Sequence, residues 1–161
     1  MVETAINVSQ AHVPAHIIHD ILKMGRDILN HPIHLLPGVA ESLPQLAKTY
    51  KLILITRGDL FHHENKFASS NLGDFLKDVH IVSEKRTATY KRIFSDDVNA
   101  AAMVGNSIKS DIVPALEAGA TAIHVPARYE WDIDKESEPT SNPRFIKVLG
   151  FKYNQNFLTQ I

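Results

Sequence analysis

One stretch of the sequence, residues 101–126, constrains the fold more than any other. It reads AAMVGNSIKSDIVPALEAGATAIHVP. An apolar run ends in Gly105, a polar cluster and a short helical pattern follow, and after Gly119 a second apolar run covers 121–125. The order of strand, polar loop, helix and strand is typical of a βαβ unit, which joins two parallel strands through a helix. We therefore expect an α/β fold.

The rest of the chain continues this alternation. The segment KLILIT at 51–56 is a continuous apolar run, as expected for a strand that is buried on both faces, and a shorter run covers 79–82. Apolar residues at helical spacing predict helices after Pro14 and over about 39–49, 61–70 and 87–94, with a loop at 95–99. The sequence therefore predicts a doubly wound parallel sheet with strands near 51–56, 79–82, 101–105 and 121–125.

Composition excludes several classes of function. The 161 residues are enough for one hydrophobic core, and the net charge of −1 indicates neither a nucleic-acid partner nor an anionic membrane surface. The absence of cysteine excludes disulfides, thiolate zinc sites and a cysteine nucleophile. The sequence has no apolar run as long as a membrane span and no signal-peptide pattern, so a cytoplasmic protein is expected.

Polar side chains follow the ends of the predicted strands. Thr56 ends the 51–56 strand, Lys85 follows the 79–82 strand, and Asn106 and Asp111 follow the 101–105 strand. Open α/β sheets bind their ligands at these carboxyl ends. A hydroxyl and an ammonium group suit the oxygens of a phosphoryl group, whereas amide and carboxylate oxygens suit Mg²⁺. Thr56 and Lys85 are therefore the candidate catalytic residues, and Asn106 and Asp111 the candidate metal ligands.

In this order, three segments resemble motifs of the haloacid dehalogenase-like (HAD) hydrolase superfamily. LILIT resembles the second motif, Lys85 in VSEKRTATY the third, and MVGNSIKSDIVPALEAG the fourth. PGVAESLPQLAKTY and the HVP at 124–126 extend the resemblance to about residues 32–150. In such enzymes an aspartate attacks phosphorus and water then hydrolyses the aspartyl-phosphate, with Mg²⁺ as cofactor. The resemblance implies a Rossmann-like, HAD-type fold and hydrolysis of a small phosphorylated substrate, a phosphomonoester.

Two departures from the family pattern affect these expectations. The leading aspartate of the fourth motif is Asn106 here, whose amide oxygen can bind Mg²⁺ but carries no charge. The first motif, DxDx(T/V), which carries the nucleophile after the central first strand, has no counterpart before Thr56. The single Asp-x-Asp, Asp132–Asp134, follows no predicted strand and is expected to be a solvated loop. The sheet is therefore expected to lack its central first strand, and this chain alone is predicted to be inactive.

The resemblance also implies a domain organisation. Residues 1–36, with their N-terminal helix, correspond to the remnant of a helical cap, 37–126 to the α/β core, and 127–161 to a C-terminal tail that packs on the core. Without the first strand, a slot is expected between the 51–56 and 101–105 strands. Exposed strand edges are rare in proteins, so we expect either that these two strands pair directly or that the slot is filled by a missing N-terminal segment or a homodimer partner.

Three functions are compatible with the sequence. The first is that the chain forms the larger part of a Mg²⁺-dependent HAD-like phosphohydrolase. The second is a non-catalytic relative that binds a phosphorylated ligand or a protein, for which Asn106 is the relevant feature. The third is a 2-haloacid dehalogenase, which shares the aspartate nucleophile but needs no metal.

Overall fold

The structure is a computed structural model that describes residues 1–29, 34–58, 72–127 and 136–150. The chain divides into two compact units, Met1–His34 and Leu35–Ile161. The helix predicted near 61–70 lies outside the described residues.

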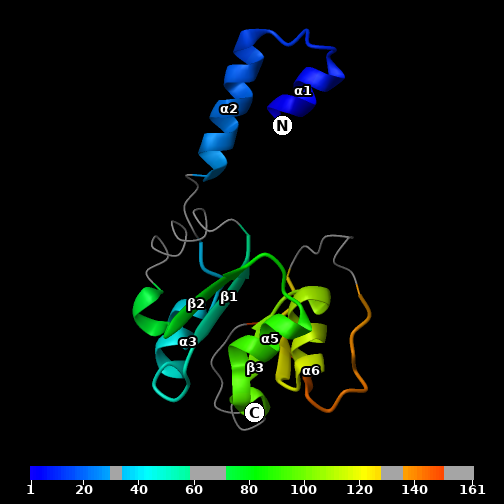
Figure 1. Cartoon of the computed structure of the whole chain (residues 1–161). Coiled ribbons are helices and arrows are strands. Elements are labelled where there is room, and N and C mark those ends of the chain that lie inside the picture. Colours follow the sequence, from blue (N-terminus) through cyan, green and yellow to red (C-terminus); the bar gives the residue numbers. More distant parts are fainter. Residues whose placement is uncertain (30–33, 59–71, 128–135, 151–161) are drawn as a thin grey trace. The chain divides into compact units, whose positions relative to one another are not determined.

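The first unit contains two helices, α1 at Val2–Val8 and α2 at Ala15–Leu29 (Figure 1). α2 begins directly after Pro14, as the sequence predicts. α1 was not predicted, because its seven residues span only two turns and give too short a pattern to recognise. No residue of either helix is buried. Among the described residues, no helix combines the length and the apolar character needed to cross a membrane.

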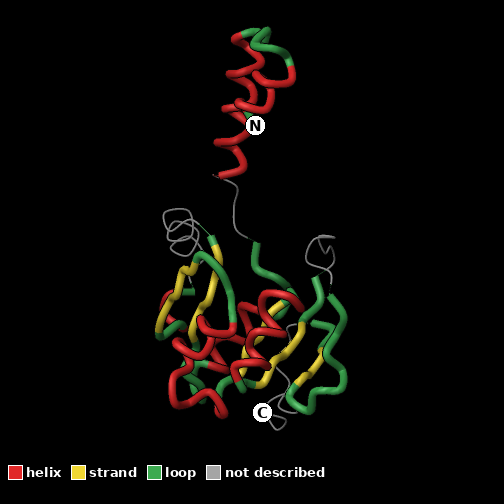
Figure 2. The backbone as a smooth tube through the Cα atoms, turned by 45° about the vertical axis from the view of Figure 1, so that its right-hand side comes forward, coloured by secondary structure: helices red, strands yellow, loops and turns green. Residues whose placement is uncertain are grey.

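Five strands of the second unit are described, and every described pairing is parallel (Figure 2). β1 and β2 form one sheet, and β3, β4 and β5 form another in that order. The strands are β1 at Ile53–Arg57, β2 at Asp78–Val82, β3 at Ala102–Gly105, β4 at Thr121–His124 and β5 at Phe145–Lys147. The four predicted strands and the α/β fold are confirmed.

β5 lies in the C-terminal tail and is not among the four strands that the sequence predicts. Phe145, Ile146 and Lys147 pair with the last three residues of β4. Three residues are too few for an alternating pattern to be recognised, so this strand depends on its neighbour rather than on its own sequence.

The helices of the second unit are short. α3 at Val39–Leu46 contains Pro44 and ends two residues after it. α5 covers Thr87–Phe94, a π-helical turn at Ile108–Ile112 continues directly into α6 at Val113–Ala118, and a 3₁₀ turn covers Gly73–Phe75. A second 3₁₀ turn at Ser95–Ala100 occupies the segment that was predicted to be a loop.

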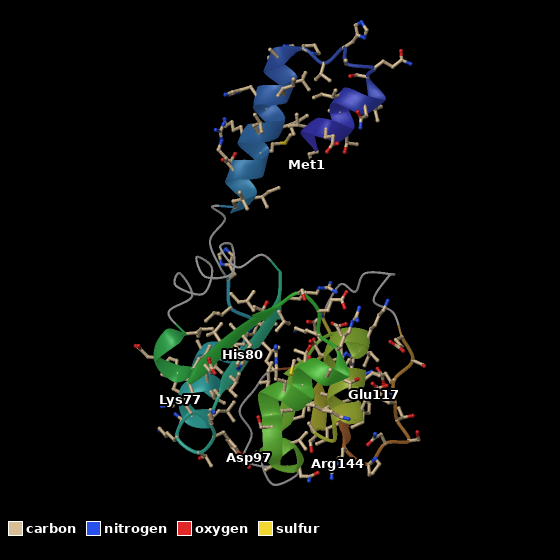
Figure 3. All side chains as sticks on the ribbon, viewed as in Figure 1. Met1, Lys77, His80, Asp97, Glu117 and Arg144 are labelled. Atoms are coloured by element: carbon tan, nitrogen blue, oxygen red, sulfur yellow. The ribbon has the colours of Figure 1, made fainter. Side chains whose placement is uncertain are left out.

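Polar contacts tie these helices together. The hydroxyl of Thr87, at the start of α5, donates to the carboxylate of Glu117 on α6. Glu117 is labelled in Figure 3. Arg144, just before β5, donates from Nη1 to the carbonyl oxygen of Gly119 and to Oδ1 of Asn99. Gly119 ends α6 with a positive φ of 102°, a conformation that glycine adopts without strain.

One hydrophobic core spans both sheets. Ile55 of β1 belongs to the same cluster as Met103 of β3, Tyr90 of α5 and Ile112 of the π-helical turn. Tyr90 and Ile112 are fully buried. The β1–β2 sheet and the β3–β4–β5 sheet are therefore packed on each other through their side chains.

β1 and β3, which belong to different sheets, are not paired with each other among the described residues. Within the described residues, β1 has β2 as its strand partner and β3 has β4, and no backbone hydrogen bond joins β1 to β3. Val104, in the middle of β3, remains 36% exposed. The absence of a central first strand stays a prediction.

Candidate functional site

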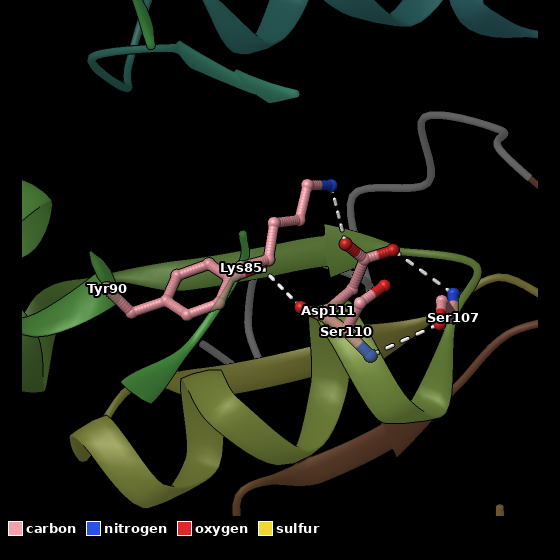
Figure 4. A network of polar contacts seen from close by, with 5 residues as sticks. All are labelled: Lys85, Tyr90, Ser107, Ser110 and Asp111. Carbon is pink, nitrogen blue, oxygen red and sulfur yellow. Dashed lines mark hydrogen bonds and ion pairs between the residues drawn. The ribbon is translucent and has the colours of Figure 1, made fainter. Parts of the chain in front are cut away.

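Lys85 and Asp111 form an ion pair that links the two sheets (Figure 4). Lys85 lies three residues after β2, and its Nζ donates to Oδ1 of Asp111 at 2.7 Å. Asp111 lies in the π-helical turn that follows β3. The lysine side chain is 14% exposed and the aspartate side chain 5% exposed. The structure thus brings together one candidate catalytic residue and one candidate metal ligand.

The backbone around Gly105 is shaped to admit the Asp111 carboxylate. Oδ2 of Asp111 accepts a hydrogen bond from the N–H of Ser107 at 3.1 Å. A Cβ atom added at Gly105 would lie 2.4 Å from the Cβ of Asp111, which is closer than two carbon atoms can approach. Gly105 is therefore required for the close approach of the strand end to the carboxylate.

Two further hydrogen bonds hold the turn that carries Asp111 (Figure 4). The side chain of Ser107 caps the turn and accepts from the N–H of Ser110 at 3.2 Å. The hydroxyl of Tyr90 donates to the carbonyl oxygen of Ser110 at 3.0 Å. Burial, and secondarily the negative charge of Asp111, raises the pKa of the Tyr90 phenol, so this group stays a neutral donor.

Thr56 and Asn106 lie at the carboxyl ends of β1 and β3, as the sequence predicts. Thr56 is the penultimate residue of β1, is half-buried, and pairs in register with Ile81 of β2. Asn106 directly follows β3 and is exposed, while its backbone carbonyl accepts from His124. Their proposed roles in catalysis and metal binding stay predictions.

The candidate metal ligands fit Mg²⁺ in kind but not in number. Asn106 and Asp111 offer the oxygen atoms that Mg²⁺ prefers. Both carboxylate oxygens of Asp111 already accept hydrogen bonds, one from Lys85 and one from Ser107. In the part of the chain that the structure describes, no group of three or more His, Asp or Glu side chains is placed to hold a metal ion. A Mg²⁺ site would therefore need further ligands. Asp132–Asp134 lies outside the described residues.

Sequence reasoning missed three residues that support the site. Ser107 and Tyr90 hold the turn of Asp111, and His124 contacts the carbonyl of Asn106. The spacing of Ser107 and Ser110 is a signal for a helix cap that could have been recognised. Tyr90 and His124 give no such signal, since their hydrogen bonds connect residues 20 and 18 positions apart.

The chain is similar to solved structures of one family. A haloacid dehalogenase-like family hydrolase from Xanthomonas campestris is 32% identical, with a TM-score of 0.86 over 99% of this chain and 69% of the other. The ion pair at the carboxyl ends of parallel strands and this similarity define the class: the chain belongs to the haloacid dehalogenase-like hydrolase family.

Two more distant structures share the fold. A 2-haloacid dehalogenase from Pseudomonas syringae pv. Tomato is 20% identical, with a TM-score of 0.59 over 94% of this chain and 66% of the other. The putative HAD-hydrolase YfnB from Bacillus subtilis, determined bound to magnesium, is 18% identical, with a TM-score of 0.58 over 73% of this chain and 53% of the other. No protein-family model and no curated protein matches the chain.

Proposed function

We propose that this chain forms the larger part of a Mg²⁺-dependent phosphohydrolase that acts on a small phosphomonoester. The observation that carries the proposal is the ion pair of Lys85 with Asp111. It lies where the ends of β2 and β3 meet, the edge at which α/β sheets bind ligands. Membership of the haloacid dehalogenase-like hydrolases supports the hydrolytic chemistry.

Each candidate residue has a role that its chemistry allows. The ammonium of Lys85 would neutralise phosphoryl oxygens, and Asp111 would hold that ammonium in place. The hydroxyl of Thr56 would donate a hydrogen bond to the same group. Phosphoryl transfer depends mainly on such positioning and charge stabilisation.

The nucleophilic aspartate is proposed to come from a polypeptide segment outside these 161 residues. No Asp-x-Asp precedes Thr56 in the sequence. An additional parallel strand between β1 and β3, from a preceding segment or from a homodimer partner, would pair both strand edges and cover Val104. The same segment would add carboxylates to Asn106 and Asp111, and Mg²⁺ bound there would supply positive charge against the substrate's anionic oxygens. The 161-residue chain alone is therefore proposed to be inactive.

Two measurements test this proposal. The chain alone is incubated with p-nitrophenyl phosphate and Mg²⁺, and no turnover is expected. Measurable turnover would disprove the claim that the nucleophile is missing from this chain.

In the second measurement, inorganic phosphate is titrated into the ¹⁵N-labelled chain. We expect amide shifts at Lys85 and Ser107 in the wild type and in K91M, which changes an exposed lysine on α5, and none in K85M. Equal shifts in K85M and K91M would rule out the phosphate site.

Asn106 favours a second candidate function, a non-catalytic protein that binds a phosphorylated ligand. Asn106 is exposed, and its amide contributes no charge to a metal site. Phosphate binding without Mg²⁺ dependence, together with no turnover when the chain is assayed with the segment proposed to supply the nucleophile, would favour this function. Turnover of a 2-haloacid by that combination without Mg²⁺ would instead favour the dehalogenase.

A further inference from the structure

His124 contacts the loop of the candidate site from the neighbouring strand. It is the last residue of β4, which lies between β3 and β5, and its side chain is 6% exposed. Its Nε2 lies 3.1 Å from the carbonyl oxygen of Asn106. A carbonyl oxygen can only accept a hydrogen bond, so Nε2 carries the hydrogen and donates.

The contact reaches Asp111 through a single peptide unit. The carbonyl of Asn106 and the N–H of Ser107 belong to the same planar peptide group. Nε2 of His124 donates to the oxygen of this peptide group at 3.1 Å. The N–H of the same peptide group, which belongs to Ser107, donates to Oδ2 of Asp111 at 3.1 Å. The two hydrogen bonds are made at opposite edges of one rigid peptide plane. Rotation of the peptide would weaken both, because both donors and acceptors would lose alignment.

The histidine ring is itself held by the segment around β5. It stacks on Phe145, with ring centroids 6.4 Å apart. Its Nδ1 faces Oε1 of Glu138 at 3.8 Å and has no hydrogen-bond partner among the described residues. The same oxygen of Glu138 accepts from Nζ of Lys147 at 2.5 Å. The stacking contact therefore orients the ring, and Phe145 lies far in the sequence from the Asp111 turn.

We infer that His124 is a positioning residue, which fixes the Asn106–Ser107 peptide and, through it, the carboxylate of Asp111 that holds Lys85. The backbone favours this role, since the N–H of Val125 donates to the carbonyl of Gly105 at 2.9 Å and aligns His124 with the loop. Hydrogen bonds in such a chain polarise and strengthen one another. The inference rests on the proposed function only in treating this loop as the ligand-binding loop.

Two substitutions separate positioning from simple packing. H124Q keeps an N–H donor at a similar reach, whereas H124L keeps the volume and removes the donor. Amide hydrogen exchange is measured by ¹⁵N NMR at Ser107, and at Ala122 of β4, whose N–H donates to the carbonyl of Arg144 at 2.9 Å. We expect exchange at Ser107 to rise about tenfold in H124L, with little change at Ala122, and H124Q to restore most of the protection.

A role in packing alone would give a different result, namely equal exchange in H124L and H124Q, or an equal rise at both amides. H124F serves if H124L does not fold, because it keeps an aromatic ring that can stack on Phe145 and removes the donor. There, exchange at Ser107 is expected to rise more than at Ala122, and no difference would overturn the inference. Phosphate titration of the wild type tests the proposed function independently. If phosphate does not bind, the proposed function is wrong, but the comparison of hydrogen exchange still decides whether His124 positions the loop.

Discussion

Nζ of Lys85 and Oδ1 of Asp111 lie 2.7 Å apart, and this pair joins the end of the β1–β2 sheet to the turn that follows β3. Both side chains are largely buried. A buried charge that loses its partner stays desolvated without compensation, so removing one member costs more than the pair itself contributes. The ion pair therefore makes the stability of the core depend on the candidate site.

Replacing Lys85 by methionine is expected to destabilise the chain by roughly 3–5 kcal/mol, because Asp111 would remain buried without its cation. Urea unfolding, followed by circular dichroism, measures the loss. K91M is the matched control, since Lys91 is exposed on α5. A K85M variant no less stable than K91M would contradict the coupling of site and core.

Replacing Gly105 by alanine is expected to lower stability by about 1–3 kcal/mol, since the added methyl group would overlap Asp111. The control is G150A, because a Cβ at Gly150 meets nothing within 4 Å. Midpoints of thermal unfolding compare the two variants. Similar midpoints would mean that the Asp111 turn moves away from the strand end at little cost.

Replacing Tyr90 by phenylalanine removes the hydrogen bond to the carbonyl of Ser110 and is expected to cost about 0.5–1.5 kcal/mol at neutral pH. Tyr50, which is 37% exposed, gives the control variant Y50F. The free energy of unfolding of both variants is measured in urea. An equal cost in both would show that the buried hydroxyl contributes nothing specific.

The raised pKa of Tyr90 also predicts a dependence on pH. Since the folded-state pKa lies above the ordinary value of 10.0, the unfolded state loses the phenolic proton first as the pH rises. The contribution of Tyr90 to stability is therefore complete below about pH 10 and declines above it. Between about pH 9 and 11, wild type should lose more stability than Y90F. Parallel curves for the two proteins would contradict the burial of this phenol.

Replacing Arg144 by alanine is expected to destabilise the chain by about 0.3–1 kcal/mol, because the guanidinium donates to the carbonyl of Gly119 at the end of α6. R92A, at an exposed position of α5, controls for the loss of a surface charge. High salt should reduce the effect of R144A, and an effect insensitive to salt would argue for packing rather than charge.

Local sequence was sufficient for the elements with strong patterns. The apolar run at 51–56 and the βαβ pattern of 101–126 became β1, β3, α6 and β4, because continuous apolar runs and turn residues specify such elements within a short window. The seven-residue α1 and the three-residue β5 were missed. Their patterns are too short to recognise, and β5 depends on its pairing with β4.

Tertiary structure decided how the candidate residues meet. The sequence by itself determined that Thr56, Lys85, Asn106 and Asp111 lie at or after the ends of strands, and the motifs around them were enough to identify the family. It could not determine that Lys85 and Asp111 pair across two sheets, or that His124 and Asp111 hold opposite sides of one peptide plane. These contacts join residues from different strands, and only the packing of the sheets sets the distances between them.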